Sequence, residues 1–149
     1  MRSIIGHHML LLAGANVIIA RSDGHILLQQ RTDSTWGLPG GLPEPGESLE
    51  LTAVREVKEE TSIDIHSLNF LKIFSGQDYS FILHNRHEIN VITALYFTDN
   101  WSGDLVNDAK EGLALEFFSA SRLPSPMNNE YVMYIKYFVN SYRCPPDTD

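Results

Sequence analysis

The stretch Gly41–Ile63, GLPEPGESLELTAVREVKEETSI, joins a loop rich in glycine and proline to an acidic amphipathic segment. Glycine and proline interrupt regular structure, so the first half predicts irregular backbone. Ser48 is a favourable N-cap and Thr61-Ser62 ends the periodic pattern, which predicts a helix between them. The expected apolar stripe of this helix comprises Leu51, Val54 and Val57.

Four glutamates accompany the predicted helix: Glu47, Glu56, Glu59 and Glu60. The last three recur at i, i+3 and i+4, which places them on one helical face, roughly opposite the apolar stripe. Taken alone, this spacing favours a solvated acidic face, which Arg55 and Lys58 partly neutralise.

Two features near these acids favour a metal site instead. Glu47 lies just before the helix, so a fourth carboxylate can reach the same face. Gly40-Gly41 permits close approach of the backbone, so a main-chain carbonyl there can add an oxygen ligand. Oxygen ligands at high charge density suit Mg²⁺ or Mn²⁺, whereas zinc prefers thiolate and imidazole. We therefore expect a site for Mg²⁺ or Mn²⁺.

The same stretch resembles the Nudix box, G-x5-E-x7-R-E-U-x-E-E-x-G-U, in which U is a bulky aliphatic residue. Gly41, Glu47 and the run Arg55–Ile63 match every specified position except one, because Ser62 stands where the family has glycine. That glycine ends the helix, so we expect the exchange to affect stability rather than chemistry. The sequence WGLPGG, Trp36–Gly41, is also similar to members of this family.

The resemblance, to MutT-like Nudix hydrolases, implies a role for each box residue. It implies Glu59 and Glu60 as the principal metal ligands, and Glu56 as a further ligand or a base that orients water. The other implied roles are metal ligation by the Gly41 carbonyl and Glu47, and ion pairing of the acids by Arg55. Family members place the general base either in the box or on a later loop, so Glu56 and Glu111 are both candidates.

Two residues outside the box are candidates for substrate binding. Arg31 follows the second predicted strand and can reach a phosphate; a surface arginine is the alternative. Tyr79 lies sixteen residues after Ile63. A tyrosine near this distance is found in dinucleoside polyphosphate hydrolases, and a plain strand aromatic is the alternative.

The resemblance implies hydrolysis of a phosphoanhydride bond in a nucleoside diphosphate linked to another moiety. The expected substrate is therefore of nucleotide type: a nucleotide sugar, ADP-ribose, a dinucleoside polyphosphate or a (d)NTP. One alternative is a non-catalytic Nudix-fold domain that binds a nucleotide or regulates a partner. A calcium-stabilised structural domain is another, but the chain lacks a twelve-residue calcium-loop pattern.

Composition limits the other function classes. The chain has 149 residues, 43% of them hydrophobic, which predicts one globular domain over residues 1–149. A net charge of −8 argues against binding a nucleic acid polymer. The single cysteine, Cys144, requires no oxidising compartment. The apolar run Met9–Ala20 is too short to span a membrane and predicts a buried strand. These features predict a cytoplasmic protein, and an exposed strand and aromatic face leave room for a homodimer.

The rest of the chain predicts an α/β fold. Two strands, Ala15–Ala20 and His25–Gln30, flank a turn and predict a hairpin. Apolar spacing predicts a C-terminal helix over Asn128–Tyr142. The resemblance implies a Nudix fold, an α/β/α sandwich around a mixed sheet with the box as loop–helix–loop. The remaining predicted strands are Leu68–Phe74, Tyr79–Leu83, Ile89–Thr98 and Leu113–Phe118.

Overall fold

The computed structural model describes residues 9–82, 88–107, 110 and 112–142, and its central element is a mixed sheet. The strands of this sheet are β1 (Met9–Ile19), β4 (Gly40–Gly41), β6 (Asn69–Phe74), β7 (Ser80–Ile82) and β8 (Glu88–Thr98). They run in the order β4-β1-β8-β6, and β7 also pairs with β8. β1 and β8 are parallel over their full lengths, and the other pairs are antiparallel.

Two smaller sheets complete the β-structure of the described residues. One contains β2 (Ile26–Gln30), β3 (Trp36–Gly37) and β10 (Ala114–Phe118), in the order β10-β2-β3. The other pairs β5 (Asp64–Ile65) with β9 (Trp101–Ser102).

The predicted hairpin between the first two strands is wrong. β1 and β2 meet only at an isolated bridge between Ala20 and Ile26, beside the turn. Beyond it β1 continues into the large sheet and β2 pairs with β10. Both strands are apolar enough to be buried, each within its own sheet. The turn between them therefore did not determine which strands they pair with.

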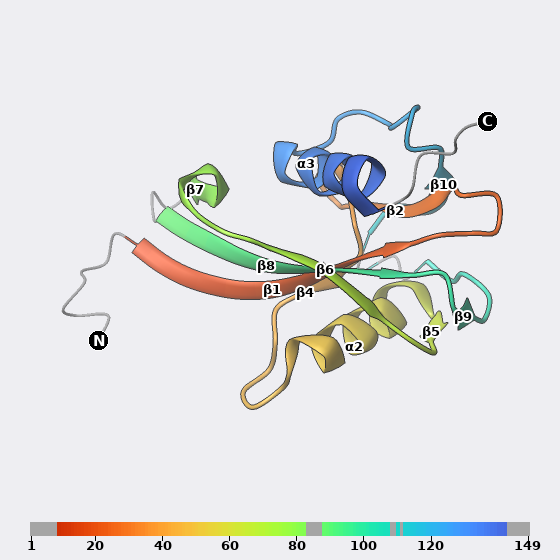
Figure 1. The fold of residues 1–149 in the computed structure, drawn as a ribbon, viewed down its shortest axis with the longest axis horizontal. Helices are drawn as coiled ribbons and strands as arrows, with labels where there is room; N and C mark the ends of the chain where they lie inside the picture. The colour runs from red at the N-terminus through yellow and green to blue at the C-terminus, as the bar shows by residue number, and fades with distance from the viewer. Residues whose placement is uncertain (1–8, 83–87, 108–109, 111, 143–149) are drawn as a thin grey trace.

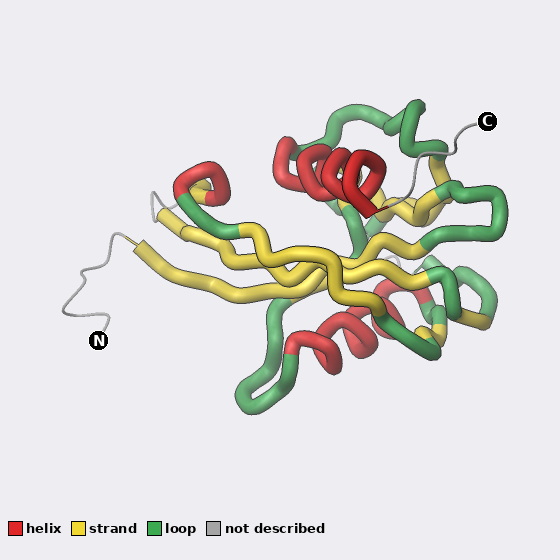
Figure 2. Tube along the Cα trace, viewed as in Figure 1, coloured by secondary structure: helices red, strands yellow, loops and turns green. Residues whose placement is uncertain are grey.

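Two helices cover opposite faces of the large sheet (Figure 1). They are α2 (Leu49–Thr61) and α3 (Asn129–Tyr137), and α3 continues as a π-helical turn over Phe138–Tyr142. The expected α/β/α arrangement around a mixed sheet is therefore confirmed. Figure 2 shows that a loop connects β4 to α2, and residues 62–63 connect α2 to β5, so the box has its expected loop–helix–loop form.

Alternation along β1 supplies both layers of the core. Ile18 faces the core beneath α3, with Leu95, Tyr134 and Phe138. Its neighbours Val17 and Ile19 face the core beneath α2, together with Ala53 and Val57. Successive side chains of a strand point to opposite faces, so a continuous apolar run is buried on both sides.

Most predicted elements occur near their expected positions. β6, β8 and β10 lie within the predicted strands or extend them by one residue. Tyr79 instead belongs to a 3-10 turn, Gln77–Tyr79, that precedes β7, and Leu83 lies outside the described residues. None of the helices in the described part of the chain is long and apolar enough to span a membrane.

Candidate active site

The site begins where β4 packs against β1. Gly40 lies opposite Asn16 in the pairing register and has a φ of +152°, a backbone conformation that side chains disfavour. A Cβ at Gly40 would also overlap the carbonyl oxygen of Ala15. Only glycine therefore allows the chain to pass this close to β1.

Asn16 holds the same segment through its side chain. Its Nδ2 donates to the carbonyl oxygens of Leu38 (3.2 Å) and Pro39 (3.3 Å), and the Val17 amide donates to Pro39 (3.0 Å). The sequence prediction missed Asn16. The signal was present, because Asn16 is the one polar side chain in the run Met9–Ala20.

Helix α2 begins and ends as expected. Ser48 Oγ accepts a hydrogen bond from the Leu51 amide (3.1 Å), which satisfies a first-turn donor. The helix ends at Thr61, and Ser62 adopts the left-handed conformation at φ 69°, with its amide bonded to the Lys58 carbonyl. Ser62 thus occupies the glycine-type position that the sequence pattern indicated.

The predicted apolar stripe of α2 is partly wrong. Leu51 is 61% exposed, whereas Thr52, Ala53 and Val57 face the sheet. The small side chains of Thr52 and Ala53 let α2 approach the sheet closely on that face. This packing sets the rotation of α2 about its own axis, which the apolar periodicity of the sequence does not specify.

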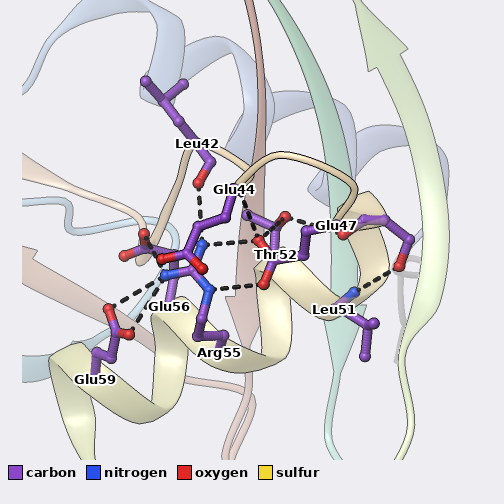
Figure 3. Close-up of polar contacts among 9 residues, drawn as sticks. Leu42, Glu44, Glu47, Leu51, Thr52, Arg55, Glu56 and Glu59 are labelled. Atoms are coloured by element: carbon purple, nitrogen blue, oxygen red, sulfur yellow. Dashed lines mark hydrogen bonds and ion pairs between the residues drawn. The ribbon is translucent and has the colours of Figure 1, made fainter.

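The guanidinium of Arg55 links three of the predicted carboxylates (Figure 3). Nε and Nη2 donate to the two carboxylate oxygens of Glu47 at 2.7 and 2.8 Å. Nη1 donates to Glu56 at 3.1 Å and lies 3.4 Å from both carboxylate oxygens of Glu59. Nη2 also donates to the Leu42 carbonyl (3.1 Å), so Arg55 ties the loop to the helix.

Glu47 is the most firmly held of these acids. Besides Arg55, its carboxylate accepts hydrogen bonds from the Thr52 hydroxyl (2.8 Å) and the Glu44 amide (3.1 Å). The Arg55 hydrogen bond, followed by those from Glu44 and Thr52, lowers the pKa of Glu47 to about 2. Glu47 is therefore a carboxylate throughout the physiological pH range.

Glu56 lies directly against the glycine loop. A Cβ at Gly41 would lie 2.5 Å from the carboxyl carbon of Glu56, so Gly41 leaves the space that this side chain fills. Burial raises the pKa of Glu56, and the hydrogen bond from Arg55 opposes that rise. A partly desolvated carboxylate suits either metal binding or proton transfer.

Glu59 and Glu60 differ sharply in exposure. The Glu59 side chain is 51% exposed, whereas Glu60 is only 5% exposed and accepts a hydrogen bond from the Gly40 amide at 3.1 Å. The prediction that all three helical acids lie away from the buried face is therefore wrong for Glu60. The buried N–H of Gly40 needs an acceptor, and Glu60 supplies it.

The donor chemistry of this cluster fits a hard divalent cation. Four carboxylates are present with one guanidinium, so negative charge exceeds positive charge locally. Within the described ranges, no three acidic, histidine or cysteine side chains already converge as a metal cage, and three of the carboxylates face Arg55. The residues that would hold the ion are Gly41, through its carbonyl, and Glu47, Glu56, Glu59 and Glu60.

A cavity of about 830 Å³ opens beside the glycine loop. Gly41 both borders this cavity and contacts Glu56, so the acidic cluster and the cavity meet at Gly41. The apolar side chains that line the cavity come largely from the large sheet. The polar side chains come mainly from Asn16 of β1, from the loop after β2 and from the N-terminal part of α3. The lining includes Asn16, Arg31, Asp33, Phe81, Ile89, Val91, Glu130, Tyr131 and Tyr134.

Of the two predicted substrate-binding residues, Arg31 borders the cavity and Tyr79 does not. Arg31 lines the cavity, and its Nη2 donates to the Leu38 carbonyl (3.1 Å) and the Tyr131 hydroxyl (2.9 Å). Tyr79 is 6% exposed and packs against Phe74 and Tyr134 rather than bordering the cavity. Tyr79 is thus a core aromatic of the 3-10 turn rather than the strand aromatic given as the alternative, and its substrate role stays a prediction.

One predicted site residue, Glu111, and one residue that the prediction missed, Tyr131, remain to be placed. Glu111 lies outside the described residues, so its candidacy as general base also stays a prediction. Tyr131 lies within the predicted C-terminal helix but was not among the predicted site residues, yet it borders the cavity and accepts a hydrogen bond from Arg31. Its partner lies 100 residues away, and helical spacing does not reveal such a contact.

Comparison with known proteins places this geometry in context. The profile of the NUDIX domain matches residues 10–138. A Bacillus subtilis protein whose name ascribes to it 8-oxo-dGTP diphosphatase activity is 33% identical over 112 residues, covering 74% of this chain and 68% of that protein. An ADP-ribose pyrophosphatase of Methanocaldococcus jannaschii is 35% identical over 112 residues, covering 71% and 61% of the two chains.

The fold is also found among solved structures. The crystal structure of a MutT Nudix hydrolase from Burkholderia pseudomallei superposes with a TM-score of 0.74 at 26% identity. The match covers 85% of this chain and 97% of that one. The layered architecture therefore has a solved counterpart.

Proposed function

The chain belongs to the Nudix family and is a Nudix pyrophosphohydrolase, and we propose that it hydrolyses a phosphoanhydride bond in a nucleoside diphosphate linked to another moiety. One observation supports this reaction above the others. Arg55 gathers Glu47, Glu56 and Glu59 beside Gly41, and Gly41 borders the cavity. A charged oxygen cluster thus adjoins a space large enough for a nucleotide-sized ligand.

We further propose Mg²⁺ or Mn²⁺ as the cofactor, because Nudix hydrolases generally need a divalent metal. When bound, such an ion would neutralise negative charge on the phosphoanhydride oxygens. Arg55 orients the carboxylates that hold it, and Glu47 stays ionised through its bonds to Arg55 and Thr52.

Glu56 is the proposed general base within the described residues. Its carboxylate lies against Gly41, and burial raises its pKa toward the range in which a carboxylate accepts a proton efficiently. Glu111 remains the second candidate. Glu56→Gln and Glu111→Gln variants separate them, because only loss of the base removes the acidic limb of the pH–rate profile, where the rate rises as the base loses its proton.

Arg31 is the proposed phosphate ligand. It is the only cationic side chain among the described residues that border the cavity, whereas Asp33 and Glu130 are acidic. Phe81, Ile89 and Val91 offer an apolar surface on which a nucleoside can lie. The two relatives described above are named for 8-oxo-dGTP and ADP-ribose, which supports a substrate of nucleotide type.

A substrate panel tests the proposal. Purified protein is incubated with ADP-ribose, UDP-glucose, diadenosine tetraphosphate, dGTP and 8-oxo-dGTP, with Mg²⁺, with Mn²⁺, or with EDTA. We expect release of a nucleoside monophosphate from at least one substrate, abolished by EDTA. Nucleotide binding by folded protein without hydrolysis of any panel member would instead support the non-catalytic alternative.

Three broader expectations remain predictions. We propose that residues 1–149 act as one catalytic domain, which the family match over residues 10–138 supports. A homodimer and a cytoplasmic location are expectations from the sequence, and size-exclusion chromatography with light scattering tests the first.

A further inference from the structure

Arg31 is held at the cavity wall by groups from two distant parts of the chain. Its Nη2 donates to the Leu38 carbonyl, between β3 and β4, and to the Tyr131 hydroxyl on α3. The guanidinium also lies over the Tyr131 ring, 5.3 Å from its centre. Within the described part of the chain, Nε and Nη1 of Arg31 donate to no protein acceptor, so these donors are available to a ligand.

The surroundings of Tyr131 allow little movement. A Cβ at Gly37 would lie 2.8 Å from the Tyr131 ring and 3.0 Å from Nη2 of Arg31, so the glycine leaves room for both groups. The Tyr131 ring packs edge-on against Tyr134, whose hydroxyl donates to Thr93 at 3.1 Å. α3 is thereby connected through Tyr134 to β8 and through Tyr131 to Arg31.

Burial favours a neutral phenol at this position. Burial raises the pKa of Tyr131, and the nearby Arg31 charge opposes the rise. The hydroxyl accepts the Nη2 hydrogen bond without competing with a phosphate for the positive charge of Arg31. A carboxylate in its place would form an ion pair and weaken that attraction.

We propose that Tyr131 is a positioning residue that orients the free donors of Arg31 toward a phosphate of the substrate. The inference rests on the proposed function, because it assumes that a phosphate occupies the cavity. An arginine loses side-chain freedom when it binds a ligand, and a side chain already held in place loses less. Loss of the single hydrogen bond between Arg31 and Tyr131 therefore predicts a change in phosphate affinity of about 3- to 10-fold.

The test uses Tyr131→Phe, Arg31→Ala and the double variant of the full chain. Binding of inorganic pyrophosphate in the presence of Mg²⁺ is measured by calorimetry, and KM and kcat are measured with the best substrate of the panel. We expect Tyr131→Phe to weaken pyrophosphate binding and raise KM by about 3- to 10-fold, with a smaller fractional change in kcat. In the Arg31→Ala background the same substitution should have no further effect.

Tyr137→Phe is the matched control, because Tyr137 lies on the same helix and packs against Phe74 away from the cavity. The inference is overturned if Tyr131→Phe leaves pyrophosphate affinity unchanged, or if it weakens binding equally with and without Arg31. Thermal unfolding of each variant separates loss of positioning from loss of folded protein. If no panel substrate is hydrolysed, the proposed reaction is rejected. Pyrophosphate binding by the single and double variants still tests whether Tyr131 positions Arg31.

Discussion

Arg55 and Glu47 form a forked ion pair in which Nε and Nη2 each contact one carboxylate oxygen, at 2.7 and 2.8 Å. The two side chains come from different parts of the box: Glu47 from the loop and Arg55 from the middle of α2. A planar guanidinium matches a carboxylate in this way, whereas a lysine ammonium does not. The pair therefore joins the loop to the helix and leaves Nη1 to contact Glu56 and Glu59.

Replacing Arg55 by lysine keeps the charge and removes the fork. We expect kcat to fall by about 10- to 100-fold at saturating Mg²⁺, the usual cost of losing a group that orients metal ligands. Arg21→Lys is the control, because Arg21 forms an exposed pair with Asp23 outside the site. Turnover close to wild type in Arg55→Lys would contradict an orienting role.

The lowered pKa of Glu47 predicts a pH-dependent stability. Its pKa falls from 4.5 to about 2 on folding, so its contribution is complete above about pH 4.5 and is lost as the pH falls through 2. In EDTA, the difference in unfolding free energy between wild type and Glu47→Gln should be constant above pH 5 and shrink below pH 4.5. Denaturant unfolding of both proteins from pH 2 to 7 measures this difference in unfolding free energy. A difference that grows as the pH falls would rule out this explanation.

Glu59→Gln tests the chemistry of the most exposed box acid. Glutamine preserves the shape and removes the charge, and we expect the rate to fall by at least about 100-fold. The fold should persist because Glu59 is half exposed and makes only long contacts with Arg55. Glu116→Gln, at an exposed position of β10, is the control. A folded Glu59→Gln protein with wild-type turnover would reject the site assignment.

Gly40 and Gly41 should respond differently to alanine. At Gly41 the added Cβ meets the movable carboxyl of Glu56, so we expect a folded protein with strongly reduced activity. At Gly40 it meets the backbone of Ala15, which cannot move easily, so we expect a protein that folds poorly. Gly46→Ala controls for backbone strain, since Gly46 has φ +81° and open space around it and should cost only about 1 kcal/mol. Circular dichroism and kcat of each variant check the ranking.

Ser62→Gly should stabilise the protein without changing turnover. Ser62 adopts φ 69°, where a side chain costs about 1 kcal/mol relative to glycine. The hydrogen bonds that hold the carboxylates of the cluster come from Arg55, Thr52, Glu44 and Gly40 and do not involve the Ser62 side chain. We expect a gain of up to about 1 kcal/mol in unfolding free energy, whereas Ser62→Ala should give none. Destabilisation by Ser62→Gly would show that the serine side chain stabilises the helix end.

Local features of the box were predictable because they depend on neighbouring residues. Ser48 caps α2, and the helix ends at Thr61, because capping and the left-handed end residue are short-range effects. The rotation of the helix was not predictable. Leu51 is exposed because the small residues Thr52 and Ala53 let the other face approach the sheet.

The sequence by itself determined the family, the order of most elements and the identity of the acids, since a long spaced pattern and side-chain periodicity are properties of the chain alone. Only tertiary structure decided which acids meet. Glu60 is buried because the Gly40 amide needs an acceptor, and Arg55 draws Glu47, Glu56 and Glu59 together. Likewise, Arg31 and Tyr131 become neighbours only when α3 packs on the sheet, because contacts across 100 residues depend on packing rather than on local propensity.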